Sequence, residues 1–536
     1  MGVADWTLRK IPDGLRQRYR DDGWWPGETL GQRLDRRLAD NVGLDFVIHS
    51  DFHPYRGTFG QVRDLSRRVA AGLAARGVGP GDVVSFQTPN WIEGVSTFYG
   101  AALLGAIVAP VVHIYGRHEL GYILGECEPK VHVTASSFGR QDYLANLASL
   151  QLGFPLDVVV IDGADGYPSF AELTSADPID QPVATDPDRP ALVGWTSGTT
   201  SNPKGVIHSH ETVLAEIKQL GDRTPPTRRP TLMANPISHA IGMLGSLLGP
   251  VNRGRPVHLM DVWDPAVVLR LMTEEDLTTG GGAPFFLLSL LDHPDCTPQH
   301  IAQLEYQGMG GAPVPRAVAE RAHGLGISVF RSYGSTEHPS ITGCLYSDDL
   351  EKRLSTDGPA LPGNEMRLID PDGNESGPGE PGEIVSRGPE LFIGYTDPVL
   401  SAKALDADGW YHTGDIGVLD DDGYICITDR ISDVIIRGGE NISAAEIEEL
   451  LLRVPGVAEV AVVAAPDERM GEHAAAIVRM LPGSALPSLN EIRDHLEASG
   501  LARQKWPEEL VEVDDLPRTT SGKVQKFRLR EMLQDR

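Results

Sequence analysis

The feature that most restricts the fold is an alternation of helical and strand patterns over roughly the first 430 residues. The capping-box sequence Thr58-Phe59-Gly60-Gln61 precedes a helical stretch at 62–77. Residues 82–87 read as a strand, and LDVVVID at 156–162 is a continuous apolar run typical of a buried parallel strand. This alternation predicts α/β layers with largely parallel sheets.

Two later changes in pattern divide the chain further. Residues 361–382 are rich in Pro, Gly and Asp, which predicts turns between short strands and a small β-rich lobe at about 360–425. Near Asp429 a helix, a strand and another helix form a last unit. We therefore expect a large N-terminal domain, 1–428, of parallel-type α/β layers with the β-rich lobe, and a smaller α+β C-terminal domain, 434–536.

Composition excludes several partners. The net charge is −28, which disfavours wrapping nucleic acid or lying on an anionic membrane, so cationic sites must be local. The most membrane-like segment, 96–112, contains Pro110 and reads as a buried helix followed by a strand. No apolar signal region opens the chain, and the four cysteines form no CxxC pair. We expect a cytoplasmic protein with reduced thiols and no stable membrane insertion.

The segment WTSGTTSNPKG, 195–205, combines hydroxyls, a lysine and flexible backbone. We expect it to connect a strand at 191–195 to a helix at 208–220, a place where backbone N–H groups and hydroxyls converge on anions. It is not a P-loop, because Pro203 stands where the second glycine should be. The alternative is a solvated flexible loop.

Other motifs occur in a fixed order along the chain: PISHAIG (236–242), MGGAP (309–313), YGSTE (333–337), GEIVSRGP (382–389), YHTGD (411–415), DRISDVIIRGGENISAAEIE (429–448) and TSGK (520–523). With the hydroxyl loop they resemble the acyl-adenylate-forming superfamily of acyl-CoA synthetases, peptide-synthetase adenylation domains and beetle luciferases. The resemblance covers nearly the whole chain from about residue 30. It implies two half-reactions: a carboxylate attacks ATP to give acyl-AMP and pyrophosphate, and a thiol then displaces AMP.

The resemblance also implies the nucleotide site, and ATP, Mg²⁺ and CoA as cofactors. Glu337 would hold Mg²⁺, Thr336 the α-phosphate, and Asp415 the ribose hydroxyls. Lys523 would bridge the attacking carboxylate and the α-phosphate. The remaining ATP/AMP contacts are expected at Thr196, Ser197, Gly198, Thr199, Thr200, Lys204, Gly310, Gly311, Ala312, Tyr333, Gly334 and Arg430.

His239 is expected to gate the acid pocket, with a buried structural histidine as the alternative. The pocket is expected to be lined by His239, Gly242, Met243, Met309 and His338. Near these residues the sequence offers no obvious arginine or lysine for a second carboxylate. We therefore expect a hydrophobic monocarboxylic acid as the substrate: fatty, alicyclic, aromatic or steroid-derived.

The resemblance implies a C-terminal domain that rotates between the two steps about a hinge in DRISD, 429–433. Here Ser432 stands where the family usually has Asp or Lys, and Asp433 is a second hinge candidate. After rotation, Gly438, Gly439 and Glu440 would face the acyl-adenylate, with the glycines leaving room for the pantetheine arm of CoA.

CoA is the expected acceptor, because the chain ends soon after Lys523 and carries no carrier domain. The alternative is a free-standing enzyme that loads a separate acyl carrier protein. Rival classes are a kinase or P-loop hydrolase, a serine hydrolase, for which no GxSxG occurs, and an inactive homologue. A homodimer is compatible with the sequence.

We expect Lys523→Ala to abolish adenylate formation but largely spare acylation of CoA from supplied acyl-adenylate, because the lysine serves only the first step. Acid-dependent pyrophosphate release and acyl-CoA formation measure the two steps separately. Equal loss of both steps would contradict a two-conformation enzyme.

Overall fold

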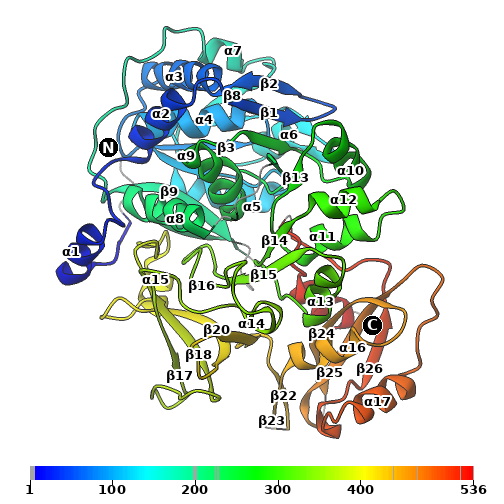
Figure 1. Cartoon of the computed structure of the whole chain (residues 1–536). Helices are drawn as coiled ribbons and strands as arrows, with labels where there is room; N and C mark the ends of the chain where they lie inside the picture. Colours follow the sequence, from blue (N-terminus) through cyan, green and yellow to red (C-terminus); the bar gives the residue numbers. More distant parts are fainter. Residues whose placement is uncertain are drawn as a thin grey trace.

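A computed structural model describes residues 6–196, 202–223, 225, 229–438, 440–467, 469–519 and 521–534. In Figure 1 the blue-to-green part of the chain forms the upper body of stacked sheets and helices. A yellow β-rich lobe and an orange-to-red C-terminal unit lie side by side below it. Of the helices described, none combines the length and the apolar character needed to cross a membrane.

The central sheet of the upper body has seven strands in the order β19-β10-β9-β4-β3-β5-β8. The five strands from β9 to β8 are parallel to one another. They confirm the expected α/β layers: the strand patterns at 82–87 and 156–162 become β3 and β8. The bounds are β3 Val83–Gln87, β4 Ile107–Pro110, β5 Val131–Thr134, β8 Asp157–Val160, β9 Pro190–Thr196, β10 Lys204–Ser209 and β19 Gly394–Tyr395.

The expected helix starts are also confirmed locally. Thr58 and Gln61 form both hydrogen bonds of a capping box at the start of α3 (Phe59–Ala75). The membrane-like segment becomes α4 (Ile92–Leu103), which is buried along its whole length, followed by β4. Its apolar character is therefore explained by burial between layers.

The connection around the hydroxyl loop differs from the expectation. Residues 204–209 form strand β10, which pairs antiparallel with β9, so that Lys204 faces Thr196 across the pair. Helix α8 (His210–Arg223) begins only afterwards. The loop thus joins two antiparallel strands. The predicted helix start at residue 208 was wrong. Residues 208 and 209 instead belong to the end of the buried strand KGVIHS.

A second sheet has the order β13-β11-β12-β1-β2. One hydrophobic core joins it to the central sheet through helices, including side chains of α2, α4, α8 and α9. The bounds are α2 Leu30–Asp40, α9 Gly249–Arg253, β1 Asp45–His49, β2 Tyr55–Thr58, β11 Thr231–Met233, β12 Val257–Met260 and β13 Thr278–Thr279.

The lower parts are antiparallel or mixed. The β-rich lobe is a four-stranded antiparallel sheet, β17-β18-β20-β21. The C-terminal unit has a five-stranded sheet covered by helices, the expected α+β arrangement. The bounds are β17 Glu365–Ile369, β18 Pro381–Arg387, β20 Tyr411–Leu419, β21 Ile425–Arg430, β22 Ile435–Arg437, β23 Glu440–Ile442, α16 Ala444–Leu451, β24 Val457–Asp467, β25 Gly471–Met480, α17 Leu489–Ala498, β26 Glu509–Glu512 and α18 Lys526–Gln534. The domain limits at 428 and 434, and rotation about 429–433, stay predictions.

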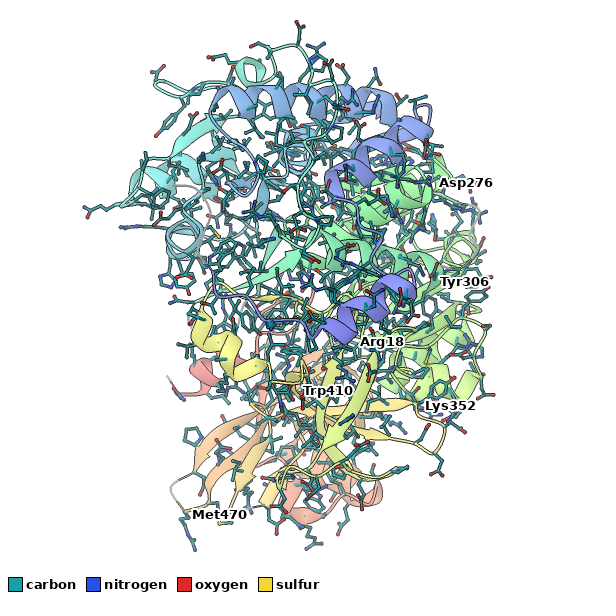
Figure 2. The ribbon with its side chains drawn as sticks, turned by 90° about the vertical axis from the view of Figure 1, so that its left-hand side faces the viewer. Arg18, Asp276, Tyr306, Lys352, Trp410 and Met470 are labelled. Carbon is teal, nitrogen blue, oxygen red and sulfur yellow. The ribbon has the colours of Figure 1, made fainter. Side chains whose placement is uncertain are left out.

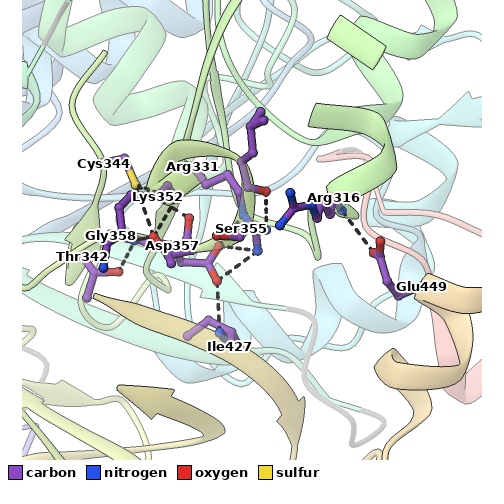
Figure 3. Close-up of polar contacts among 12 residues, drawn as sticks. Arg316, Arg331, Thr342, Cys344, Lys352, Ser355, Asp357, Gly358, Ile427 and Glu449 are labelled. Atoms are coloured by element: carbon purple, nitrogen blue, oxygen red, sulfur yellow. Dashed lines mark hydrogen bonds and ion pairs between the residues drawn. The ribbon is translucent and has the colours of Figure 1, made fainter. Parts of the chain in front are cut away.

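A buried ion pair ties the upper body to the lobe beneath it (Figure 3). Arg331, on β15 (Ser328–Tyr333), donates two hydrogen bonds to Asp357, from Nε at 3.0 Å and from Nη2 at 3.1 Å. Asp357 also accepts the backbone N–H of Ile427 on β21 at 3.1 Å. β15 leads directly into the YGSTE motif, and β21 ends at Arg430. The ion pair therefore fixes the relative positions of two segments that carry predicted site residues.

We expect Asp357→Ala to destabilise the protein by about 3–5 kcal/mol, because a buried guanidinium is left without its counter-charge. Urea unfolding followed by fluorescence measures the shift of the midpoint. Glu351→Ala is the matched control, because Glu351 pairs with Arg316 on the surface, and its midpoint should hardly move. Equal shifts for the two variants would show that the buried pair has no special role.

Candidate active site

One cavity of about 1280 Å³ lies where the upper body, the lobe and the C-terminal unit meet. Its wall includes strand ends, the segment after β15, the end of β21 and the C-terminal tail. Eight of the sequence-predicted nucleotide residues line it together: Thr196, Lys204, Tyr333, Gly334, Thr336, Glu337, Arg430 and Lys523. Gly310 and Gly311 also line it, whereas Ala312 and Asp415 are not among the lining residues.

The segment after β15 is held in a tight turn. A Cβ on Gly334 would stand 2.0 Å from the carbonyl oxygen of Pro339, so only glycine fits there. The backbone oxygen of Thr336 accepts a hydrogen bond from His208 Nε2 at 2.8 Å. The Glu337 carboxylate accepts one from the Tyr395 hydroxyl at 2.7 Å. Thr336 and Glu337 are thereby fixed on the cavity wall.

Asp415 joins two predicted nucleotide contacts. Its carboxylate, 3 % exposed, accepts the Tyr333 hydroxyl at 2.6 Å and pairs with Arg430 Nε at 2.7 Å. Burial, together with the charge of Asp415, raises the pKa of Tyr333 well above its usual value, so that the phenol stays protonated and donates. The carboxylate thus couples β15 to β20 and β21.

Lys523 reaches the cavity from a turn, not from a helix or strand. Thr519 N–H donates to the Lys523 carbonyl at 2.8 Å, and Gly522 has a φ of 84°. A Cβ on Gly522 would stand 3.0 Å from that of Ala283, so the turn lies tightly against the upper body. The Arg518 guanidinium stacks 5.0 Å from the centroid of the Phe285 ring. These contacts hold the lysine in the cavity.

The environment of Lys523 is unfavourable to its charge. Burial, reinforced by the positive charge of Arg430, lowers the pKa of Lys523 to about 8, although Asp415 and Asp433 oppose the shift. An anion entering between the lysine and Arg430 would relieve this repulsion. The site therefore favours a negatively charged ligand at this position.

His239, apolar side chains and several glycines form another part of the cavity lining. His239 lines the cavity, and burial lowers its pKa to about 4, so the ring is neutral at physiological pH. Its Nδ1 is buried without a hydrogen-bond partner among the described residues. Neighbouring lining residues are Leu220, Met233, Leu244, Gly245, Gly280, Gly281 and Gly282.

The other four expected acid-pocket residues lie behind this wall. Met243 and Met309 are packed in hydrophobic cores, and His338 is fully buried with its Nδ1 against the Ser386 hydroxyl at 2.8 Å. A Cβ on Gly242 would stand 1.9 Å from the carbonyl oxygen of Pro236, which leaves no free space. None of the four is among the lining residues of this cavity, and their place in an acid pocket stays a prediction.

The wall also contains side chains that the sequence analysis missed. Tyr395, Thr519 and Ser521 lie beside the predicted nucleotide residues. Arg223, Arg253 and Arg255 line the cavity as well, although the sequence offered no obvious arginine for a second carboxylate. The only sequence signal was NRGRP, 252–256, where two arginines flank a glycine.

Of the predicted CoA contacts that the structure describes, Gly438 and Glu440 are not among the lining residues of this cavity. Gly438 N–H donates to the Met470 carbonyl oxygen at 2.7 Å, and Figure 2 shows Met470 at the lower end of the molecule. Glu440 is exposed and is not among the lining residues. Ser432, the predicted hinge, lines the cavity beside Arg430. Ser197, Gly198, Thr199, Thr200 and Gly439 fall outside the residues that the structure describes.

Two family models cover most of the chain. The model described as AMP-binding enzyme matches residues 35–396, and the AMP-binding enzyme C-terminal domain matches residues 446–523. The chain belongs to the AMP-binding enzyme family. The resemblance to acyl-adenylate-forming enzymes is thereby confirmed.

Curated relatives of this AMP-binding enzyme span nearly its whole length. The medium-chain fatty-acid–CoA ligase of Escherichia coli (strain K12) is 33% identical over 96% of this chain and 92% of the relative. A 3-[(3aS,4S,7aS)-7a-methyl-1,5-dioxo-octahydro-1H-inden-4-yl]propanoyl:CoA ligase of Rhodococcus jostii (strain RHA1) is 37% identical, covering 94% and 98%. ATP-bound MatB from Rhodopseudomonas palustris matches with a TM-score of 0.82 at 29% identity, covering 94% and 99%.

We expect kcat/KM for pyrophosphate release, measured with acid and ATP but no CoA, to fall as the pH rises through about 8. Below this pKa the Lys523 ammonium is charged and can neutralise the reacting anions; above it the charge is lost. In the ATP complex the neighbouring anions should raise the pKa, so the fall in kcat should come at higher pH.

Lys523→Arg is the control for this pH dependence. A guanidinium stays charged throughout the range, so the variant should be slower but lose the alkaline fall. If the fall persisted unchanged in Lys523→Arg, another group would be responsible for it.

Proposed function

We propose that this AMP-binding enzyme is an ATP-dependent carboxylic acid:CoA ligase that forms acyl-AMP and pyrophosphate and then passes the acyl group to CoA. The observation that carries the proposal is the position of Lys523. A lysine of the C-terminal tail lines the same cavity as Thr336, Glu337 and Arg430, although it is separated from them by long stretches of chain.

Charge explains why this convergence suits the reaction. An acid carboxylate must approach the α-phosphate of ATP, and the mutual repulsion of these anions opposes the attack. Lys204, Arg430 and Lys523 supply three cations around one cavity in a chain whose net charge is −28. We assign Lys523 to the attacking carboxylate and the α-phosphate, Lys204 to the outgoing phosphates, and Arg430 to the ribose or phosphate.

The adenosine is assigned to the wall beside Arg430. Tyr333, with Gly310 and Gly311, would flank the adenine. Asp415 would accept the ribose hydroxyls with the oxygen capacity that remains beside its bonds to Tyr333 and Arg430. Each carboxylate oxygen can accept more than one hydrogen bond, so these roles are compatible.

The residues present also fit Mg²⁺. Glu337 places a carboxylate on the cavity wall near the Thr336 hydroxyl, and Mg²⁺ prefers oxygen ligands. When bound with ATP, the ion would neutralise phosphate charge. The family relationship supports ATP and CoA as substrates, whereas Mg²⁺ at Glu337 is our proposal.

We propose a hydrophobic acid as the substrate, because the cavity lining includes Leu220, Met233, Leu244 and glycines. The named substrates of the curated relatives, a medium-chain fatty acid and a bicyclic propanoate, support this class. A cytoplasmic location and a homodimer stay predictions.

The test is analysis of nucleotide products. We expect AMP and pyrophosphate to appear from Mg-ATP and CoA only when particular acids are present, with a matching amount of acyl-CoA. The panel contains straight-chain fatty acids, benzoate, cyclohexanecarboxylate and a steroid side-chain acid.

Three other outcomes would change the assignment. AMP without acyl-CoA would favour a carrier protein as the acceptor. ADP would indicate a kinase or hydrolase. Nucleotide binding without acid-dependent turnover would indicate an inactive homologue.

A further inference from the structure

The cavity has a second cationic region, away from Lys523. Arg223 stands at the end of α8, Arg253 at the end of α9, and Arg255 just after it, and all three line the cavity. The nearby wall is formed by Pro225, Pro230, Pro256, Glu305 and Tyr306. None of these residues belongs to the nucleotide motifs, so ATP chemistry does not account for the arginines.

Contacts within the protein position these arginines. Arg253 lies along Gly221, where an added Cβ would stand 3.7 Å from its Cδ, and its Nη1 donates to the Leu220 carbonyl at 3.5 Å. Arg255 Nη2 donates to the Arg229 carbonyl at 3.2 Å. Backbone oxygens thus help to hold the guanidinium groups of both arginines.

Arg223 packs on the backbone of β16 (Thr342–Gly343), where a Cβ on Gly343 would stand 2.0 Å from its Nη2. Its Nε is buried and has no hydrogen-bond partner among the described residues. A buried donor of this kind costs free energy unless a ligand or water satisfies it.

The net charge of this region is positive, because its nearby carboxylates are either protonated or paired with another arginine. Burial, with the nearby charge of Glu390, raises the pKa of Glu216 to about 8, so this side chain is mostly protonated at neutral pH. Glu305 is paired with Arg229 at 2.6 Å. Burial and the charge of Arg255 lower the pKa of Arg253 to about 10, the direction expected where positive charges are crowded.

The region is also within reach of the surface. Tyr306, which lines it, lies at the edge of the molecule in Figure 2. A polar ligand group there keeps part of its hydration, so the arginines do not require a fully desolvated anion.

We propose that these arginines bind oxygen at the far end of the substrate acid, so that the preferred substrate has an apolar body and a terminal carboxylate or ketone. The proposal rests on the proposed ligase function and specifies its substrate. The carboxylate of the acid would lie at Lys523, its body along Leu220, Met233 and Leu244, and its terminal oxygen at Arg223, Arg253 and Arg255. Guanidinium N–H groups bind carboxylates in pairs and also donate to ketone oxygens.

The test compares three series of acids with equal numbers of carbons: straight-chain monoacids, α,ω-dicarboxylic acids and ω-oxo acids, of about six to sixteen carbons. We expect kcat/KM of the preferred dicarboxylic or oxo acid to exceed that of its monoacid by about 10- to 100-fold, mostly through KM. The two oxygenated series distinguish a carboxylate from a ketone terminus, and the best length reports the span between the two ends of the cavity.

Variants assign the preference to the arginines. Arg253→Met and Arg255→Met should each remove most of it, lowering kcat/KM for the oxygenated acid while that for the monoacid stays equal or rises. Arg270→Met is the matched control, because Arg270 is an exposed arginine paired with Glu274 on α10 (Pro265–Glu274), and it should leave the ratio unchanged. Monoacid turnover that does not fall below that of the unmodified protein shows that each variant is folded.

Three results would overturn the proposal. The first is a preference for monoacids at every length, and the second is an equal loss of kcat/KM for monoacids and oxygenated acids in the arginine variants. The third is a rise in KM for CoA with unchanged acid selectivity, which would place CoA phosphates at the arginines. Failure of the ligase function itself is separate: it would appear as no acid-dependent AMP with any series.

Discussion

The site depends on keeping two positive side chains, those of Lys523 and Arg430, close together where Lys523 is buried. The Lys523 ammonium and the Arg430 guanidinium repel each other, and burial lowers the pKa of the lysine to about 8. Neither cation could be held there without structural support. Asp415 anchors Arg430, and the turn at 519–523 packs against Ala283 and Phe285, so the repulsion is balanced until anionic substrates arrive.

The support extends well beyond the cavity. The Arg331–Asp357 pair joins β15 to β21, the two strands that end at the predicted nucleotide residues. The Arg316 N–H donates to Glu449 at 3.1 Å and links α13 (Arg316–Gly324) of the upper body to α16 of the C-terminal unit (Figure 3). Such contacts between separate parts hold the C-terminal lysine at a site that the upper body otherwise builds.

Much of the fold was predictable because the deciding interactions are local. The Thr58–Gln61 capping box and the apolar run at 156–162 each determine their own element. The strand at 204–209 was missed because its buried, unbroken pattern depends on pairing with β9 and β19, which no local signal reveals. Met243 and Met309 lie in hydrophobic cores, because proximity in sequence to a motif does not say which face of an element a side chain occupies.

The sequence by itself determined the family, the α/β architecture and the chemical types of the nucleotide residues, because these are encoded in short motifs with fixed spacing. Only the tertiary structure decided which cations meet. Arg223 and Arg253 come from the ends of two helices, and they share a cavity with Lys523 because long-range packing brings these segments together. Charge crowding and burial, which shift pKa values and select ligands, are properties of that packing and not of any segment alone.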